Sequence, residues 1–179
     1  MSKNTVEVEL RALITQSTIE KINSKPKKVS QEHDLYFRYK TDKKKSWIVR
    51  IRRKGNKHVL TYKSSKKFGE GAWDEVNIPV GKRVALQLAS FFEDNEHNLE
   101  VEIAKFRRTF KIDGMEINVD EIENLGTFIE AEILAKVENI EGAKDKIRAY
   151  FKKLDIPDVN ITEKGYVGLM RDKKYGITS

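Results

Sequence analysis

The chain has 179 residues, of which 39% are hydrophobic and 35% are charged, and its formal net charge is +7. This length suffices for one domain with a proper core, and the composition is that of a charge-rich globular protein. The excess of positive charge favours polyanionic partners such as nucleotides, polyphosphate or nucleic acid, without choosing among them.

Residue types and segments that the sequence lacks exclude several kinds of site. It has no cysteine, which excludes disulfide bonds and thiolate metal sites, and its three histidines lack the spacing of a zinc site. No apolar run approaches the roughly 20 residues that a membrane span needs, and no signal peptide opens the chain. We therefore expect a soluble cytoplasmic protein, with no membrane partner, that forms a single domain over residues 1–179.

Five strands are predicted in the first half of the chain. The stretch VEVELRAL, residues 6–13, alternates between apolar and charged side chains, which is typical of a half-buried strand because successive side chains point to opposite faces. A short helix is expected over residues 17–25, since Pro26 stops it. The other strands are predicted at residues 33–40, 47–53, 57–64 and 72–80. They are separated by an exposed lysine turn at 43–45, a hairpin turn at 54–56 and a loop at 65–71.

Amphipathic patterns and a hairpin signal predict the elements of the second half. Helical periodicity indicates a helix over residues 82–92, and the turn Asp113-Gly114 joins strands at 99–111 and 115–120. A strand at 127–136, an amphipathic helix at 142–154 and a short helix at 162–170 follow. Strands at short spacing, interrupted by helices, predict an α+β fold in which helices pack outside an antiparallel sheet or barrel.

The charged faces of the predicted strands are sorted by sign. An ordinary antiparallel sheet also has one wet face, but such a face usually mixes both signs within a strand. Only the strand at 99–111 departs from a clean pattern, because Val101 and Ile103 share a face with its basic residues. Three strands are acidic on the polar face, with Glu7 and Glu9, Asn118 and Asp120, and Glu130 and Glu132. Three are basic there, with Arg50 and Arg52, Lys63, and Lys105 and Arg107.

Paired carboxylates on one face of a strand indicate a cation. Two residues apart, they lie about 7 Å from each other and repel unless a cation lies between them. Such an oxygen-rich site suits Mg²⁺ or Mn²⁺. Arginine and lysine on the facing strands would hold phosphate. If the sheet closes with its charges inside, it forms a cationic tunnel with a metal on one wall, and a triphosphate would fit that tunnel.

Six motifs in chain order resemble those of one superfamily. The ExExR of Glu7, Glu9 and Arg11 resembles the ExExK signature of the CYTH superfamily, the triphosphate tunnel metalloenzymes. The segments HDLYF, RIR, LTYK and KFRR look like its successive strand motifs. Residues 119–132, VDEIENLGTFIEAE, are similar to the LDxVxxLGxFxExE block of the class IV adenylyl cyclase branch. The resemblance covers about residues 5–170 and implies an eight-stranded antiparallel barrel, open at both ends, with helices outside.

The resemblance also implies roles for the charged residues on the polar face. Four glutamates and one aspartate would hold divalent metal, directly or nearby: Glu7, Glu9, Glu130, Glu132 and Asp120. Five basic residues would clamp the triphosphate: Arg50, Arg52, Lys63, Lys105 and Arg107. Glu75 would orient a basic neighbour at the substrate. The candidates for direct participation in catalysis are Arg11, Lys63 and Asp120.

Arg11 departs from the family's usual lysine. An arginine can still bind phosphate, but it stays protonated in proteins. This residue is therefore unsuited to be a general base, which argues against a hydrolytic mechanism that needs a deprotonated lysine here.

Three functions remain open from the sequence. The cyclase-like motifs favour conversion of ATP to cyclic AMP and pyrophosphate. The alternative is a triphosphatase that hydrolyses inorganic tripolyphosphate, thiamine triphosphate or nucleoside triphosphates, and either enzyme could form a homodimer, as family members often do. A non-enzymatic RNA- or polyphosphate-binding protein would suit the net charge and the aromatics Tyr36, Phe37, Tyr39 and Tyr62. Such a binder has no use for clustered carboxylates beside its arginines, so nucleic acid is not the expected partner.

Overall fold

The computed structural model describes residues 5–40, 46–64, 72–94 and 99–176. The lysine turn expected at 43–45 and the loop expected at 65–71 lie outside these residues. The described strands are β1 (Thr5–Leu13), β2 (Lys28–Lys40), β3 (Ser46–Lys54), β4 (Lys57–Ser64), β5 (Ala72–Val80), β6 (Leu99–Ile112), β7 (Met115–Ile122), β8 (Gly126–Lys136) and β9 (Ile161–Thr162). The described helices are α1 (Gln16–Glu20), α2 (Lys82–Asp94), α3 (Ile140–Lys153) and α4 (Tyr166–Tyr175).

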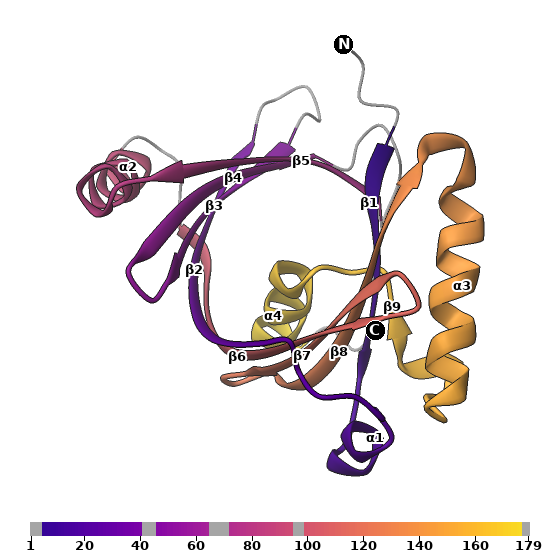
Figure 1. Ribbon diagram of the computed structural model, residues 1–179. Helices are drawn as coiled ribbons and strands as arrows, with labels where there is room; N and C mark the ends of the chain where they lie inside the picture. The colour runs from indigo at the N-terminus through magenta and orange to yellow at the C-terminus, as the bar shows by residue number, and fades with distance from the viewer. Residues whose placement is uncertain (1–4, 41–45, 65–71, 95–98, 177–179) are drawn as a thin grey trace.

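The strands form one antiparallel sheet that curls around a hollow (Figure 1). Their order across the sheet is β5-β4-β3-β2-β6-β7-β8-β1-β9. β5 also returns to β1, where Glu7 lies opposite Trp73 and Val8 opposite Ala72. Farther along that edge, Arg11 and Ala12 pair with β9, so the seam between β1 and β5 is short among the residues that the structure describes. The predicted α+β fold with a large antiparallel tunnel sheet is confirmed, and β9 is an addition to it.

The hairpin turns follow the sequence signals. At the β6–β7 turn, Asp113 and Gly114 have φ angles of 51° and 77°. Two successive positive φ values suit a tight type I′ turn, which aspartate and glycine tolerate. At the β3–β4 turn, Gly55 has a φ of 56°. Both two-residue turns were predicted, and they fix the register of the hairpins that carry the charged residues.

Two helices cover the outer face of the sheet, as predicted. α3 packs on β1 and β8, and its Ile147 and Phe151 meet Leu10 and Ile129 in a core where all four are fully buried. α2 packs its Ala85 and Ala89 against Phe37, Val49 and other residues of β2 to β4. The outer face under these two helices is apolar because the charged residues of the strands there point inward, which is the alternation that the sequence shows.

α4 lies on the inner side of the curled sheet instead of outside it (Figure 1). Its Tyr166 and Val167 pack against Ile103, Ile122 and Phe128, which point inward from β6, β7 and β8. The expectation that every helix packs outside was therefore wrong for this one. The apolar residues that share a face with the charges of β6 give the reason, because they form an apolar area inside the sheet.

Other boundaries differ from expectation for local reasons. β2 begins at Lys28, five residues before the predicted start, because its first half pairs with β6 although it lacks apolar alternation. α4 begins at Tyr166, because residues 161–162 pair with β1 as β9. α1 covers only five residues, Gln16–Glu20. Within the part of the chain that the structure describes, no helix has the length and apolar character needed to cross a membrane.

The packing of α3 yields a prediction about stability. Replacing Ile147 by alanine removes a fully buried side chain between α3 and the sheet, and we expect a loss of about 2–5 kcal/mol in the free energy of unfolding. Urea denaturation followed by circular dichroism measures this loss. Val159→Ala is the control, since Val159 is 90% exposed and should change the stability by less than about 0.5 kcal/mol. Equal midpoints for the two variants would contradict this account of the core.

Candidate functional site

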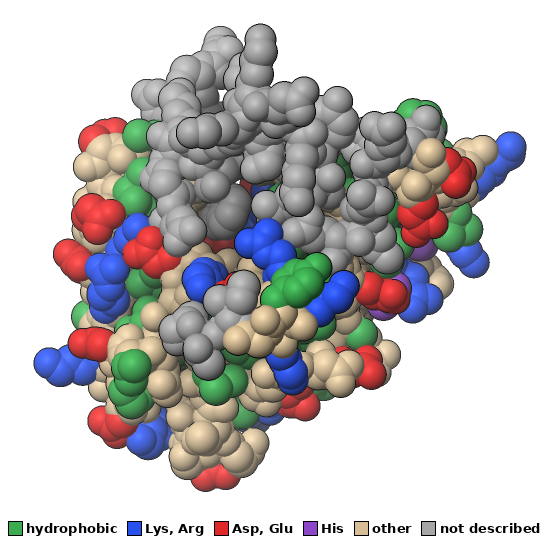
Figure 2. Space-filling model, turned by 180° about the vertical axis from the view of Figure 1, so that it is seen from behind, with side chains coloured by type: hydrophobic (Ala, Val, Ile, Leu, Met, Phe, Trp, Pro, Cys, Tyr) green, Lys and Arg blue, Asp and Glu red, His purple; other side chains and the backbone are tan. Residues whose placement is uncertain are grey.

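Strands β1 to β8 and α4 line a large cavity. Its volume is about 700 Å³, and most of the side chains that line it are charged. They come from the faces of the strands that the sequence analysis identified as polar. On the outer surface seen in Figure 2, by contrast, acidic and basic side chains are intermixed. The sorting by sign is thus a property of the inner face.

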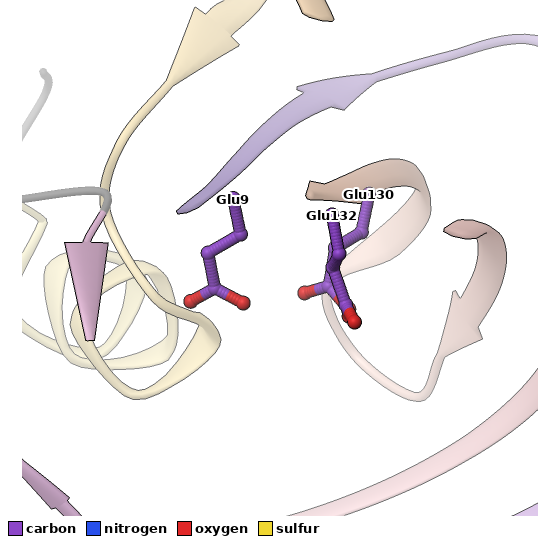
Figure 3. A group of neighbouring side chains, drawn as sticks. All are labelled: Glu9, Glu130 and Glu132. Atoms are coloured by element: carbon purple, nitrogen blue, oxygen red, sulfur yellow. The ribbon is translucent and has the colours of Figure 1, made fainter. Parts of the chain in front are cut away.

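Three carboxylates meet on one wall of this cavity. Glu9 on β1 lies directly across from Glu132 on β8, and Glu130 follows the same face of β8. Each offers one oxygen, and these oxygens all lie within 4.8 Å of one another (Figure 3). Glu9 and Glu130 are almost completely buried. Burial and the neighbouring charge of Glu130 raise the pKa of Glu132 well above its usual range.

Arg11 binds two of these carboxylates. Its Nη2 lies 2.8 Å from Glu9 Oε1 and 2.6 Å from Glu130 Oε2. Its guanidinium carbon lies 4.8 Å from the centre of the Tyr166 ring. Burial alone would lower the pKa of Arg11, but Glu130 and Glu9 outweigh it and raise that pKa further. Arg11 therefore stays protonated, as its residue type predicts, and is a cationic part of the site.

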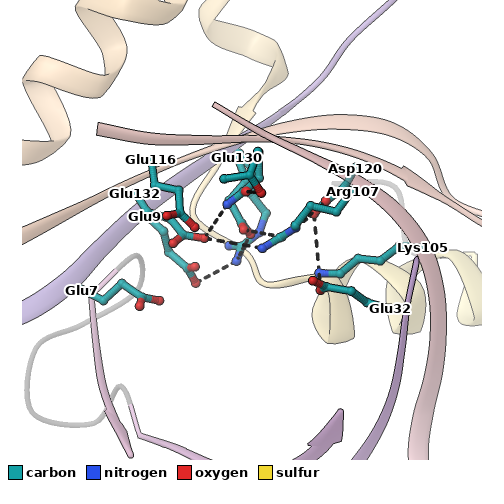
Figure 4. A network of polar contacts seen from close by, with 12 residues as sticks. Glu7, Glu9, Glu32, Lys105, Arg107, Glu116, Asp120, Glu130 and Glu132 are labelled. Carbon is teal, nitrogen blue, oxygen red and sulfur yellow. Dashed lines mark hydrogen bonds and ion pairs between the residues drawn. The ribbon is translucent and has the colours of Figure 1, made fainter. Parts of the chain in front are cut away.

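Asp120 lies beside the carboxylate group and does not join it. It is fully buried on β7 and accepts two hydrogen bonds from Arg107, from Nε at 2.6 Å and from Nη2 at 2.5 Å (Figure 4). The same Nη2 reaches Glu130 Oε1 at 2.6 Å. Lys105 Nζ lies 3.6 Å from Asp120 Oδ2. Asp120 thus fixes the direction of Arg107, which the sequence analysis placed among the phosphate ligands.

Glu7 also lies apart from the three carboxylates, toward β4 and β5. Lys63 Nζ lies 3.4 Å from Glu7 Oε1 and 2.5 Å from Glu75 Oε2. Arg50 Nη2 lies 3.6 Å from Glu75 Oε1. Glu75 thus contacts two basic side chains at once, in agreement with the orienting role that the resemblance implies. The remaining member of the set, Arg52, lies on the same inner face of β3.

Two acidic residues of the site were missed by the sequence analysis. Asp34 is fully buried and accepts hydrogen bonds from Arg52 Nε and Nη2, at 2.7 and 2.6 Å. Glu32 lies 3.1 Å from Arg52 Nη1 and also pairs with Lys54. These cations hold the pKa of Glu32 at about 2, although burial opposes them. The alternation of Glu32, Asp34 and Tyr36 along β2 was the available signal.

Three buried donor atoms on the cavity wall have no hydrogen-bond partner among the described residues. They are Arg11 Nε, Arg50 Nε and Tyr166 Oη. A buried donor without an acceptor is costly, so native structures seldom keep one unless a ligand or water satisfies it. All three side chains carry donors, which suits a ligand rich in acceptor oxygens.

The carboxylate group fits a hard divalent cation. Its donors are all carboxylate oxygens, which Mg²⁺ and Mn²⁺ prefer. The like charges raise the pKa of Glu132, and a bound cation would relieve that repulsion. Glu9, Glu130 and Glu132 are therefore the residues that could hold the metal among the five predicted to do so.

The fold of this chain is shared with several solved structures. PH1819 from Pyrococcus horikoshii OT3 has a TM-score of 0.77 and 23% identity, over 93% of this chain and 99% of its own. A candidate adenylate cyclase from Vibrio parahaemolyticus has a TM-score of 0.71 and 14% identity, over 94% and 99%. HpAC1 from Hippeastrum has a TM-score of 0.63 and 18% identity, over 98% and 97%. The TM-scores show a common fold, and at these identities the similarity shows the fold alone.

The family follows from the sequence comparison. No curated protein matches the chain. The model of the CYTH domain matches residues 5–166, which include every charged strand described above. Together with the curled antiparallel sheet and its charged inner face, this match shows that the chain belongs to the CYTH domain family.

Proposed function

We propose that this protein is a divalent-metal-dependent enzyme that acts on a triphosphate inside its cavity, with ATP converted to cyclic AMP and pyrophosphate. One observation carries the proposal: a group of three carboxylates shares the inner face with arginines and lysines of several strands, among them the five expected to clamp the triphosphate. Carboxylates alone would suit a metal, and basic residues alone would suit an anion. Their combination in one cavity suits a metal-bound polyphosphate.

The metal would be held by Glu9, Glu130 and Glu132. A divalent cation bound there supplies charge neutralisation for phosphate oxygens during phosphoryl or nucleotidyl transfer. The nearby ion pair of Arg107 and Asp120 keeps one guanidinium aimed across the carboxylates. Glu7, which lies toward Lys63, stays a proposed contributor from the neighbouring strand edge.

The basic side chains would hold the triphosphate in a fixed direction. Arg52 is oriented by Asp34, Lys63 and Arg50 by Glu75, and Arg107 by Asp120. Each cation is thus held in place before substrate arrives, which lowers the entropy lost on binding. The forked donors of arginine match phosphate oxygens, and lysine adds a point charge.

The cavity favours a nucleotide over a bare phosphate chain. Its volume is about 700 Å³, and apolar side chains such as Tyr36 and Ile48 line part of it. A nucleoside would occupy that part. In the cyclisation, the ribose 3′-oxygen attacks the α-phosphorus, the bond to the β-phosphate oxygen breaks, and the hydroxyl proton passes to solvent. Arg11 stays protonated and would stabilise the phosphate charge without accepting that proton.

Triphosphate hydrolysis is the second candidate. HpAC1 from Hippeastrum, which shares the fold, is described as having a dominant triphosphatase activity. In that reaction water attacks a terminal phosphorus, and the same metal and cations would serve it. A non-enzymatic RNA or polyphosphate binder is disfavoured, because buried carboxylates beside the arginines would weaken its affinity.

A product analysis separates the two reactions. The protein is incubated with ATP, and separately with inorganic tripolyphosphate, in Mg²⁺ or Mn²⁺ and in chelator. We expect cyclic AMP and pyrophosphate from ATP, and only when metal is present. Release of ADP and phosphate would replace the cyclase by the triphosphatase. No turnover of either substrate with either metal would contradict the enzymatic proposal.

The metal site is tested with Glu132→Gln. This change keeps the shape of the side chain, and the raised pKa of Glu132 means that a neutral side chain is tolerated there without metal. We expect the folded protein to keep its thermal stability in chelator. The Mn²⁺ concentration needed for half-maximal stabilisation should rise at least about tenfold, since one anionic ligand is lost.

The control is Glu138→Gln, at an exposed carboxylate that forms a surface ion pair with Lys136. Thermal unfolding over a series of Mn²⁺ concentrations compares the two variants with the parent. If Glu132→Gln and Glu138→Gln respond to Mn²⁺ alike, Glu132 is not a metal ligand.

A further inference from the structure

The first turn of α4 faces the cavity with its backbone exposed to a ligand. Residues 163–168 line the cavity as the chain enters this helix. The first N–H groups of a helix have no acceptor within it. Gly165, at the N-cap, has no side chain to accept from them, and the first bond of the helix runs from Leu169 N–H to its carbonyl. The positive end of the helix dipole is thus directed at the cavity.

The Tyr166 hydroxyl points to a ligand at the same place. Tyr166 is 5% exposed, and its Oη has no hydrogen-bond partner among the described residues. Its ring is fixed edge-on to Phe128, with the ring centres 5.6 Å apart. Arg11 and Lys105 lie over the ring, at 4.8 and 5.4 Å from its centre. A rigid phenol is therefore held between two cations with its donor unused.

Arg11 connects this turn to the carboxylate wall. Its Nη1 donates to the carbonyl of Lys164, at 3.5 Å, and its Nε is buried and unpartnered within the described part of the chain. A Cβ added to Gly165 would meet nothing within 4 Å, so open space lies in front of the N-cap. Three kinds of donor, from Tyr166, Arg11 and the backbone, thus converge on one region.

The acidic residues near the turn are neutralised by other partners. Glu163 accepts hydrogen bonds from Lys144 at 2.9 Å and Arg148 at 3.4 Å, both on α3. Asp172 pairs with Lys164 at 2.9 Å. Burial and the nearby carboxylates of Asp120 and Glu130 raise the pKa of Tyr166, and both carboxylates pair with Arg107. An anion at the start of α4 would therefore meet free donors, and the carboxylates close to it already have basic partners.

We propose that the first turn of α4, Gly165 to Gly168, is a phosphate subsite that binds one phosphate group of the substrate through the Tyr166 hydroxyl, the free backbone N–H groups and Arg11 Nε. Oxyanions bind at helix N-termini by the same combination of free donors and dipole. The inference rests on the proposed function for the identity of the ligand as a triphosphate. It adds a helix to a site that the charged strands alone would otherwise form.

Two substitutions test the subsite, with inorganic tripolyphosphate as the probe and calorimetry in Mg²⁺ as the measurement. Tyr166→Phe removes one oxygen and leaves the ring over its cations, and we expect about tenfold weaker binding. Gly165→Asp supplies an N-cap carboxylate that accepts from the free N–H groups and repels the anion. We expect it to raise the unfolding temperature while weakening binding about tenfold or more.

Matched controls make the same changes away from the cavity. Gly81 precedes α2 on the outer face, accepts the bond from Ala85 N–H at 2.9 Å, and has no atom within 4 Å of an added Cβ. Gly81→Asp should therefore raise the unfolding temperature and leave binding unchanged. Tyr175→Phe, at a residue that is 65% exposed, should leave binding unchanged.

The outcomes separate this subsite from the proposed function. If the parent binds tripolyphosphate and both Tyr166→Phe and Gly165→Asp bind it equally well, the subsite is overturned and the triphosphate site stands. If the parent binds no tripolyphosphate, both proposals fail. Weaker binding in the two α4 variants, with the two controls unaffected, supports the subsite.

Discussion

Pairing of buried charges inside the cavity is the constraint on which this structure depends. A buried charge is tolerated only if an opposite charge or a set of hydrogen bonds compensates it. The sheet meets this requirement by setting acidic and basic residues side by side, on neighbouring strands or within one strand. Asp34 pairs with Arg52, Asp120 with Arg107, and Arg11 with Glu9. The interior is therefore an extended network, in which removing one residue leaves the charge of its partner buried and uncompensated.

The same network explains how the protein could exchange internal partners for a ligand. Arg11 and Arg107 both bind Glu130, which is also a proposed metal ligand. A metal and a polyanion that arrive together bring charges of both signs, so each can compensate the groups of opposite charge on the wall. The network could then reorganise without leaving a net buried charge, which is why a metal-bound anion suits this cavity better than a metal or an anion alone.

The strands and the charge of each inner face could be predicted, because apolar and charged residues alternate along the strands. The apolar residues cover the outer face, and the charged residues lie on the inner face. The first half of β2 was not predicted, because neither of its faces is apolar: Val29 is exposed, and Ser30 and Glu32 point inward. Asp34 could not be assigned for a different reason. Its burial depends on Arg52, 18 residues away, and an acidic residue in a polar segment looks the same whether its partner is protein or water. The place of α4 depended on a few apolar residues on an otherwise charged face, and its own apolar side chains are not gathered on one side.

The short seam between β1 and β5 determines where the curled sheet can open most easily. Among the described residues, each other junction between neighbouring strands from β1 to β8 is held by seven or more residue pairs, whereas this one has two. Widening the ring here breaks the fewest backbone hydrogen bonds and leaves the core under α3 intact. The seam begins at Glu7, beside the proposed metal wall. The width of the cavity and the position of the proposed metal wall are thus linked. A bulky ligand that separates β1 from β5 would displace Glu7 and Lys63, which contacts it.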